Sequence, residues 1–376
     1  MKVMTIVGTR PEVIRLSRVV ERLRDVTNHV LVHTGQHYDF EFKDLLFNQL
    51  GLAPADISLN TASESTASSM ANVIAQADRV LGEERPDALL VLGDTTSCLA
   101  AIPAQRRGIP VFHMEAGNRC FDRRVPEELN RKIVDHVSDV NLCYSEQSRT
   151  NLLREGLSPD LVIKTGSPLK EVLEYYAPKI AVSTILVDLG LNPGEYFVAS
   201  LHRQELVDSP ESLMCVLQGI TDLAKDYQRP VVFPIHPRTR QRLEEVGWEW
   251  NSHVRLHPPL GFFEFVTLQR NALCVLTDSG SISEESSILG FPAVTLRDTH
   301  ERAEAMDEAS VVLAGYSPDR LRQAVDLTIA QFKHYGPLAM PTDYSGEAVS
   351  WKVAKIILSY TDYVRSRVWR GSLPAV

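Results

Sequence analysis

Short apolar runs rich in β-branched residues alternate with amphipathic helical patterns along the whole chain. In the first half these runs lie at 3–7, 29–33, 88–92, 110–114 and 161–165. After the first run, Pro11 begins a segment in which apolar residues from Val13 to Leu23 recur at helical spacing. Strands that alternate with helices in this way are typical of parallel sheets. The pattern therefore predicts an α/β fold.

A second series of strands follows the polar, turn-rich segment DLGLNPGE. Its apolar runs lie at 196–202, 230–236, 253–257, 273–278 and 292–297. A helical pattern that runs into turns within 172–195 marks the linker. We therefore predict two Rossmann-like domains, an N-terminal one over 1–176 and a second over 177–347. The last helical pattern, within 348–376, is expected to pack back on the first domain.

The composition narrows the class of protein. Of the 376 residues, 44% are hydrophobic and 23% are charged, which suits a globular chain with large cores. The net charge of −9 has the wrong sign for bulk binding to nucleic acid or to an anionic membrane. No uncharged apolar run reaches the roughly 18 residues that span a bilayer, and Arg10 comes too early for a signal peptide. We expect a cytoplasmic protein with neither kind of partner.

Several cofactor and metal motifs are missing. The chain has neither the dinucleotide fingerprint GxGxxG nor the metal patterns HxxxH and DxD, and it has no GxSxG nucleophile motif. The scattered cysteines include no CxxC pair, and most lie in or beside apolar stretches, so we expect buried free thiols (Cys98, Cys120, Cys143, Cys215 and Cys274). The sequence predicts no cofactor and no metal site.

Ligands of open α/β sheets bind beyond the carboxyl ends of the strands, so the polar residues after each strand are the candidates. The first strand leads into GTRPE, with Arg10 at a helix start and Arg15 one turn further. Two guanidinium groups beside a helix N-terminus suit a phosphate. The alternative is a pair of surface arginines beside a helix that begins with proline.

The segment LCVLTDSGSISEES carries the clearest local signal. A buried strand leads into Ser279, Gly280 and Ser281, whose backbone N–H groups and hydroxyls suit a diphosphate at a helix start. Glu285 has the spacing to accept hydrogen bonds from ribose hydroxyls, and Arg302 adds positive charge downstream. The alternative is a capped helix whose glutamates only complement the helix dipole.

Three acids of the first half, Asp94, Glu115 and Glu127, follow strand ends or begin a helix. Carboxylates that cluster in a cleft acquire different pKa values and can divide acid and base work. The alternative for Asp94 is a helix cap, and the alternative for Glu127 is complementarity to a helix dipole. Glu115 has no such alternative, because it directly follows an apolar strand and precedes a turn.

Histidines follow two strands of the second half. His202 and Arg203 come after the strand at 196–202, where an imidazole can neutralise a leaving phosphate or move a proton. The alternative is a solvated pair at a strand end. His236 ends another strand and is a further candidate for substrate binding.

Seven motifs in this order and spacing resemble the non-hydrolysing UDP-N-acetylglucosamine 2-epimerase family over nearly the whole chain. They are GTRPEVIR, GDTTS, HMEAGNR, PEELNR, LHRQE, TDSGSISEE and RDTHER. The resemblance implies a GT-B fold, in which two Rossmann-like domains face each other across a cleft that holds a UDP-sugar. It also implies inversion at C2 of a 2-acetamido sugar.

By motif position, the resemblance assigns roles to single residues. Asp94, Glu115 and Glu127 would be the catalytic carboxylates, and His202 would lie at the diphosphate. The resemblance also implies substrate contacts by Arg10 at the sugar phosphate, Ser279, Gly280 and Ser281 at phosphate, Glu285 at ribose, Phe265 near uracil and Arg302 at the anion site.

Departures from the common motifs indicate a branch of the family. Arg15 replaces a lysine, Ser281 replaces a glycine, and HERAE replaces TERPE. Together with GNRCFDRRVPEE, HERAEAMDEAS and IILSYTDYV, these features resemble the UDP-N-acetyl-L-fucosamine synthase branch, which acts on UDP-2-acetamido-2,6-dideoxy-L-talose. UDP-N-acetylglucosamine is the alternative substrate. Arg203 and His236 complete the set of substrate-binding candidates. We also expect the protein to be a homodimer.

The chemistry constrains the mechanism independently of the resemblance. The C2 proton of the sugar is not next to a carbonyl carbon, so enolisation cannot remove it. Loss of UDP from C1 makes C2–H acidic and leaves an unsaturated glycal, to which UDP can add again. Two other classes share the nucleotide site, a GT-B glycosyltransferase and a non-catalytic UDP-sugar sensor. The three acids argue against a sensor, because binding alone does not need them.

Overall fold

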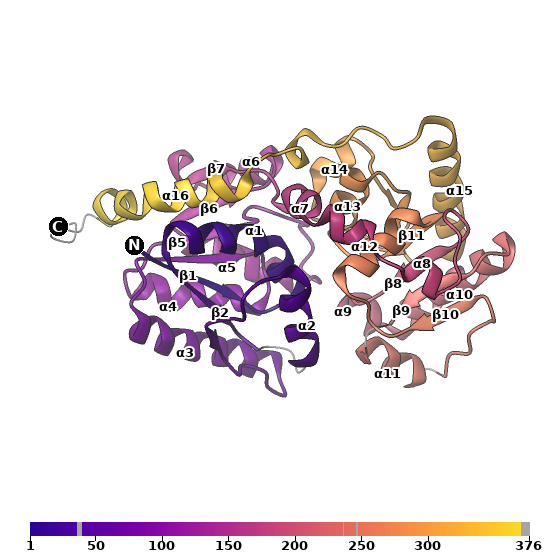
Figure 1. The fold of residues 1–376 in the computed structure, drawn as a ribbon, viewed down its shortest axis with the longest axis horizontal. Helices are drawn as coiled ribbons and strands as arrows, with labels where there is room; N and C mark the ends of the chain where they lie inside the picture. Colours follow the sequence, from indigo (N-terminus) through magenta and orange to yellow (C-terminus); the bar gives the residue numbers. More distant parts are fainter. Residues whose placement is uncertain (36–39, 236, 246, 370–376) are drawn as a thin grey trace. The chain divides into compact units, whose positions relative to one another are not determined.

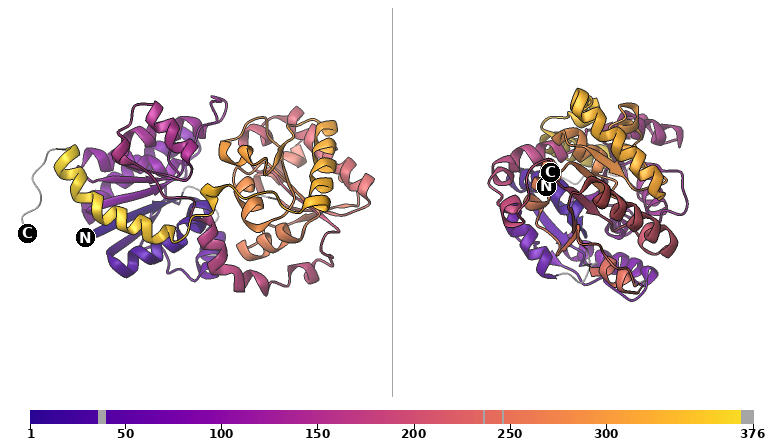
Figure 2. Two further views of the ribbon diagram at one scale, coloured as in Figure 1. Left: turned by 90° about the horizontal axis from the view of Figure 1, so that it is seen from above. Right: turned by 90° about the vertical axis from the view of Figure 1, so that its right-hand side faces the viewer.

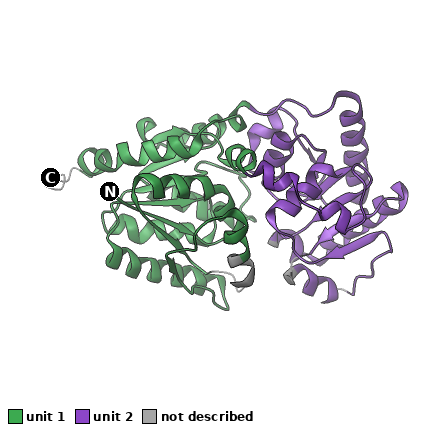
Figure 3. Ribbon diagram, viewed as in Figure 1, with its two compact units in different colours: residues 1–175, 342–376 green, residues 176–341 purple. Residues whose placement is uncertain are grey.

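The computed structural model describes residues 1–35, 40–235, 237–245 and 247–369 and divides the chain into two compact units (Figures 1 and 3). Unit 1 consists of residues 1–175 and 342–376, and unit 2 consists of residues 176–341. Helix α7 (Leu169–Ala181) carries the chain from one unit into the other. The chain returns to unit 1 at 342, six residues before the segment that the sequence assigned to it.

Unit 1 is built on a parallel sheet. Among its described residues, seven strands pair in the order β3-β2-β1-β4-β5-β6-β7. In that order they are Ile57–Ser58, Asn28–His33, Lys2–Val7, Ala88–Leu92, Val111–Met114, Val140–Cys143 and Val162–Lys164. Neighbouring strands pair in parallel throughout, as in β1 with β2, where Val3 pairs with His29.

Helices cover both faces of this sheet (Figures 1 and 2). They are α1 (Arg10–Val26), α2 (Phe40–Leu50), α3 (Thr66–Glu84), α4 (Ala101–Arg106), α5 (Glu127–Val137), α6 (Glu146–Arg154) and α16 (Val349–Tyr363), with short 3-10 turns at Thr96–Ala100, Pro159–Leu161 and Thr342–Tyr344 and a π turn at Val364–Val368. Helix α1 has Pro11 in its first turn and buries the predicted stripe from Val13 to Leu23.

Unit 2 repeats the design. Among its described residues, six strands pair in the order β10-β9-β8-β11-β12-β13. In that order they are Val254–His257, Val231–Pro234, Phe197–Ser200, Cys274–Thr277, Ala293–Thr295 and Val312–Leu313. The helices are α8 (Ile185–Asp188), α9 (Gln204–Val207), α10 (Pro210–Tyr227), α11 (Pro237–Glu245), α12 (Phe262–Asn271), α13 (Ile282–Leu289), α14 (Ala303–Asp307) and α15 (Pro318–Tyr335).

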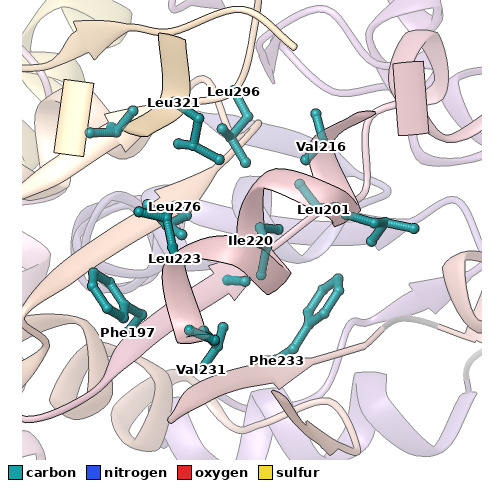
Figure 4. Packing of buried hydrophobic residues seen from close by; sticks show 14 of the residues in the cluster. Phe197, Leu201, Val216, Ile220, Leu223, Val231, Phe233, Leu276, Leu296 and Leu321 are labelled. Carbon is teal, nitrogen blue, oxygen red and sulfur yellow. The ribbon is translucent and has the colours of Figure 1, made fainter. Parts of the chain in front are cut away.

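The core of unit 2 lies between its sheet and two long helices (Figure 4). Ile220 of α10 and Leu321 of α15 pack with Phe197, Phe233 and Leu276 of three strands, and all of these side chains are buried. Both helices begin at a Ser-Pro pair, where the fixed φ of proline suits the first helical turn. Two parallel-sheet α/β units are thus present, and the predicted fold class is confirmed.

Two expectations need correction. The sequence pattern missed strand β6, because Asn141 interrupts its apolar run; the side-chain amide of Asn141 is buried and donates to the backbone oxygen of Asp135 at 2.9 Å. All five cysteines carry free thiols, but only Cys98, Cys143 and Cys274 are buried, whereas Cys215 is exposed.

Among the described residues, no helix combines the length and the apolar character that crossing a membrane requires.

A buried carboxyl ties the C-terminal segment to unit 1. Asp139 accepts a hydrogen bond from the backbone N–H of Val111 at 2.9 Å and one from the indole N–H of Trp369 at 3.0 Å. Burial raises the pKa of Asp139 to about 6, and these two donors oppose the shift. The folded protein therefore binds the Asp139 proton more tightly than the unfolded chain does.

The free energy of unfolding should consequently fall between about pH 4 and pH 6, as this proton is lost from the folded state. A pKa difference of this size corresponds to a loss of up to roughly 3 kcal/mol. Asp139→Asn keeps an oxygen for Val111 but cannot titrate. Urea unfolding at a series of pH values should show the wild type losing stability relative to this variant, and parallel profiles would contradict the assignment.

Candidate active site

The strand order of each sheet reverses at one topological switch point. The candidate residues follow the two strands that flank this point. In unit 1 this point lies between β1 and β4, which precede Arg10 and Asp94. In unit 2 it lies between β8 and β11, which precede His202 and Ser279. Such points leave a crevice at the carboxyl ends of the strands, where α/β proteins bind their ligands. Both halves of the candidate site therefore have the expected topological location.

A buried glutamate joins the loops that follow β1 and β4 in unit 1. Glu12 accepts hydrogen bonds from the Gly8 N–H at 2.6 Å and from the hydroxyls of Thr9 at 3.0 Å, of Ser97 at 2.9 Å and of Thr95. Burial raises the pKa of Glu12, and these donors partly offset the shift. The loops after β1 and β4 are thereby held together. The sequence analysis did not single out Glu12, although it lies within the GTRPE motif.

Arg15 and Glu115 meet in unit 1. Arg15 is 5% exposed, and its Nε lies 3.9 Å from Oε2 of Glu115. Its Cζ lies 5.9 Å from the ring centre of Tyr144. Arg10, by contrast, is exposed at the first position of α1. Arg15 is therefore a buried partner of a candidate acid rather than a surface residue.

Asp94 does not cap a helix. Its Oδ2 accepts hydrogen bonds from Nη2 of Arg131 at 2.6 Å and from Nε at 3.0 Å, and Asn130 donates to its backbone oxygen at 2.9 Å. The turn that follows begins after Thr95 without a side-chain cap. Two donors of one arginine converge on this oxygen and fix the direction of the carboxylate. The cap alternative is therefore wrong, and Arg131 is a site residue that the sequence analysis missed.

Arg131 also reaches the start of α5. Its Nη1 lies 3.2 Å from Oε2 of Glu128, which is 3% exposed, and the same oxygen accepts a hydrogen bond from the Cys120 N–H at 3.2 Å. Glu127 is the first residue of α5 and is half-buried. Its position suits both alternatives, dipole complementarity and proton transfer, so its role stays a prediction.

The backbone of Glu115 has a left-handed conformation with φ of +65°. The turn that follows is held by Asp135, which accepts from the Gly117 N–H at 3.2 Å and from Nη1 of Arg119 at 2.6 Å. Gly117 has φ of +85°, and a Cβ there would lie 2.2 Å from the backbone oxygen of Ser148. A strained acid on a rigidly supported turn is a common feature of functional sites.

Asp278 organises the site of unit 2. It is fully buried and accepts from the backbone N–H groups of His202 at 2.9 Å and Arg203 at 2.8 Å, while Nδ1 of His202 lies 3.1 Å from its other oxygen. Burial alone would raise the pKa of Asp278, but the nearby imidazole and these donors outweigh it, and the pKa is lowered. An ionised Asp278 therefore orients the His202 ring, and because the His202 side chain is 47% exposed, the alternative of a solvated residue at a strand end describes part of its position.

The turn after β11 has the donors expected of it. The Ser279 and Ser281 hydroxyls lie 2.9 Å apart, and the Ser281 hydroxyl donates to Oε1 of Glu285 at 2.6 Å. Ser279 also accepts from the Ser281 N–H at 3.4 Å, so the capping alternative describes part of its role. The Gln269 amide donates to the other oxygen of Glu285 at 2.7 Å. Glu285 is thus held in one orientation.

Arginines paired with glutamates surround Gly280. A Cβ at this position would lie 3.0 Å from Nη2 of Arg203 and 2.6 Å from Oε2 of Glu301. Glu301 pairs with Arg203 at 3.2 Å and with Arg297 at 3.0 Å. Arg302 lies 3.4 Å from the buried Glu284. A pocket in this unit is lined by residues that follow β11 and β12, among them Ser279, Gly280, Ser283, Arg297, Glu301 and Arg302.

The remaining candidates are less informative. Phe265 is half-buried on α12 and packs against an apolar cluster of unit 2 that includes Leu260 and Ile282. Packing in the core is therefore part of its role, and a contact with uracil stays a prediction. His236 lies outside the described residues.

The fold and these charged residues define a two-domain α/β protein in which carboxylates and arginines gather in unit 1 and a turn with two serine hydroxyls and neighbouring arginines lies in unit 2. The family model of UDP-N-acetylglucosamine 2-epimerase matches residues 21–358. The chain belongs to this family, and the predicted class of isomerase, a non-hydrolysing epimerase of UDP-sugars, is confirmed.

Solved structures and relatives resemble the chain over nearly its full length. UDP-N-acetylglucosamine 2-epimerase from Rickettsia bellii is 44% identical with a TM-score of 0.90, covering 98% of this chain and 99% of that one. The Methanocaldococcus jannaschii UDP-GlcNAc 2-epimerase in complex with UDP-GlcNAc and UDP is 31% identical with a TM-score of 0.90, covering 96% and 100%. UDP-2,3-diacetamido-2,3-dideoxy-D-glucuronate 2-epimerase of Pseudomonas aeruginosa is 32% identical, covering 88% and 93%.

Proposed function

We propose that the chain converts UDP-2-acetamido-2,6-dideoxy-L-talose to UDP-N-acetyl-L-fucosamine by inversion at C2, in the synthesis of surface polysaccharide precursors in the cytoplasm. The observation that supports the chemistry is the placement of Asp94 and Glu115 beside buried arginines in unit 1. The motif departures, above all GNRCFDRRVPEE, support the choice of sugar. Relatives about 30% identical carry names with different 2-acetamido sugars, so family membership leaves the sugar open.

The alternative substrate is UDP-N-acetylglucosamine, converted to UDP-N-acetylmannosamine. The observation in its favour is the 44% identity to the Rickettsia bellii protein that bears this activity in its name. The glycosyltransferase and sensor classes have no comparable support, because family membership defines an isomerase.

The reaction we propose has two halves that mirror each other. A base removes the C2 proton, the C2–H electron pair forms the C1=C2 double bond, and the C1–O bond breaks so that UDP leaves with its electron pair. UDP then adds back to C1 while an acid protonates C2 on the opposite face. Atoms and charge balance without an oxidant, so the residues of the chain need supply only proton transfer and charge stabilisation.

The two units would divide this work. In unit 1, Asp94, Glu115 and Glu127 would transfer the protons, and Arg15 would stabilise negative charge close to Glu115. In unit 2, Ser279, Gly280 and Ser281 would bind the diphosphate with Arg203 and Arg302, and Glu285 the ribose. His202, oriented by Asp278, would stabilise the leaving phosphate. Arg10 and His236 are proposed as further substrate contacts, and a homodimer is proposed as the assembly.

The deciding experiment measures the C2 configuration of the product by NMR. The purified protein is dialysed against a chelator and incubated, without added NAD or metal, with each of the two UDP-sugars in separate and in mixed reactions. We expect epimerisation to proceed without added NAD or metal. We also expect a higher kcat/KM for the 6-deoxy-L-talo substrate. A higher kcat/KM for UDP-N-acetylglucosamine would favour the alternative, and a new glycoside with stoichiometric UDP would indicate a transferase.

Glu285 offers a test of the nucleotide site. Because Ser281 and Gln269 hold its carboxylate in place, Glu285→Gln should remove charge-assisted hydrogen bonds to ribose without changing the fold. UDP binding should weaken by roughly 1–3 kcal/mol in calorimetry. Glu244→Gln, an exposed residue of the same unit, is the matched control. Unchanged affinity for UDP would reduce Glu285 to a residue that complements the helix dipole.

A further inference from the structure

In the sequence, an exposed aromatic residue lies between two of the candidate acids. Phe121 is 76% exposed and has φ of +56° in the segment that connects Glu115 to Glu127. The left-handed conformation is unfavourable for a residue other than glycine, and an exposed ring gains little burial in return. Neither the fold of the unit nor the roles assigned above account for an exposed ring at this position. Strain of this kind points to a function.

The backbone on both sides of Phe121 is fixed. On one side the Cys120 N–H and thiol donate to Oε2 of Glu128 at 3.2 and 3.3 Å. On the other side the Asp122 carboxylate accepts from the backbone N–H of Arg124 at 2.9 Å and from its guanidinium at 2.6 Å. The Val125 N–H, from a residue with a buried side chain, donates to the Asp122 carbonyl at 3.3 Å. The surrounding contacts therefore hold the strained conformation.

The same contacts tie Phe121 to the carboxylates. Glu128, which binds Cys120, lies 3.2 Å from Arg131, and Arg131 holds Asp94 at 2.6 Å. Two residues before Cys120, the Asn118 amide lies 3.4 Å from Oε1 of Glu115. The backbone that carries the Phe121 ring is thus fixed within a network of polar side chains that includes Asp94 and Glu115.

We infer that Phe121 determines substrate specificity by packing against the C6 methyl of a 6-deoxy sugar. This inference rests on the proposed function. An aromatic ring contacts a methyl group favourably, whereas a hydroxymethyl group in the same place would lose hydrogen bonds to water. The hydroxyl and acetamido groups of the sugar would face the polar side chains. The ring therefore favours 6-deoxy sugars over their 6-hydroxy counterparts.

The test is a competition between UDP-2-acetamido-2,6-dideoxy-L-talose and the UDP-sugar of the same ring configuration that carries a hydroxyl at C6, with the ratio of the two kcat/KM values as the readout. Phe121→Ala and Phe121→Gly should each lower the ratio of 6-deoxy to 6-hydroxy turnover by about 10–100-fold, the range for losing one apolar contact in a pocket. Glycine relieves the strained φ and alanine does not, so an equal loss assigns the effect to the ring. Tyr335→Ala, an aromatic residue of equal exposure in unit 2, should keep the wild-type ratio.

Three results would overturn the inference. Both variants could keep the wild-type ratio, both rates could fall by the same factor, or the ratio could stay constant while light scattering shows a changed oligomeric mass, which would make Phe121 a subunit contact. The activity of the wild type with UDP-N-acetylglucosamine tests the proposed function separately. A wild type that prefers UDP-N-acetylglucosamine contradicts the proposed function, yet the shift caused by the variants still decides the role of Phe121.

Discussion

Replacing Asp94, Glu115 or Glu127 by its amide should each reduce the epimerisation rate by ~10²–10⁴-fold, which is typical of losing a general acid or base. The amides preserve size, and the turn after Glu115 is held by Asp135, which accepts from the Gly117 N–H and is not changed by these substitutions. The fold should therefore survive. UDP affinity measured by calorimetry should change little, because the nucleotide is assigned to unit 2.

Exposed acids of unit 1 are the matched controls. Asp25→Asn and Glu83→Gln lie on side chains that are 61% and 56% exposed and should leave the rate within a factor of two of the wild type, as expected for surface substitutions. If the three candidate variants resemble these controls, the proton transfer has been assigned to the wrong residues.

Solvent deuterium separates the three acids. In D₂O the wild type should place deuterium at C2 of the product, because abstraction and return of the proton on opposite faces exchange it with solvent. A variant that lacks only the acid of one face should still release UDP and form the glycal, which NMR detects, without completing the epimerisation. Retention of the original hydrogen at C2 would rule out this mechanism.

The order of elements was predictable because βα units are local patterns. Each predicted strand overlaps an observed one, and Pro11 correctly marked the first turn of α1. Strand β6 was not predictable in this way, because its polar residue Asn141 is buried. A hydrogen bond to the backbone oxygen of Asp135, which only the folded chain provides, compensates for this burial. The short edge strands β3 and β13, with two residues each, are below the length that a pattern can show.

The candidate site was predictable where a residue directly follows a strand. Asp94, Glu115, His202 and Ser279 were found by this rule, which depends only on the geometry of parallel sheets. Residues that act through partners were not. Arg131 is 37 positions from Asp94, and Glu301 is 98 positions from Arg203. Such pairings are set by the tertiary fold and leave no local signal.

Arg131 is the missed residue with the largest expected effect. It is 3% exposed and bridges Asp94 and the buried Glu128, so Arg131→Met, which keeps the length and removes the charge, leaves two carboxylates without this cation. Breaking a buried ion pair on one side costs about 3–5 kcal/mol, and we expect a loss of that order in urea unfolding. The rate should fall at least ~10²-fold, because Asp94 loses the two donors that orient it.

Companion variants distinguish orientation from charge. Arg131→Lys keeps a cation without the two-pronged geometry, so it should retain more stability than activity. Glu128→Gln in the Arg131→Met background removes one of the stranded charges and should recover part of the stability but none of the rate. Arg79→Met breaks an exposed pair with Glu83 and should cost less than about 0.5 kcal/mol. If Arg131→Met is no more costly than Arg79→Met, or if Arg131→Lys is fully active, Arg131 does not position Asp94.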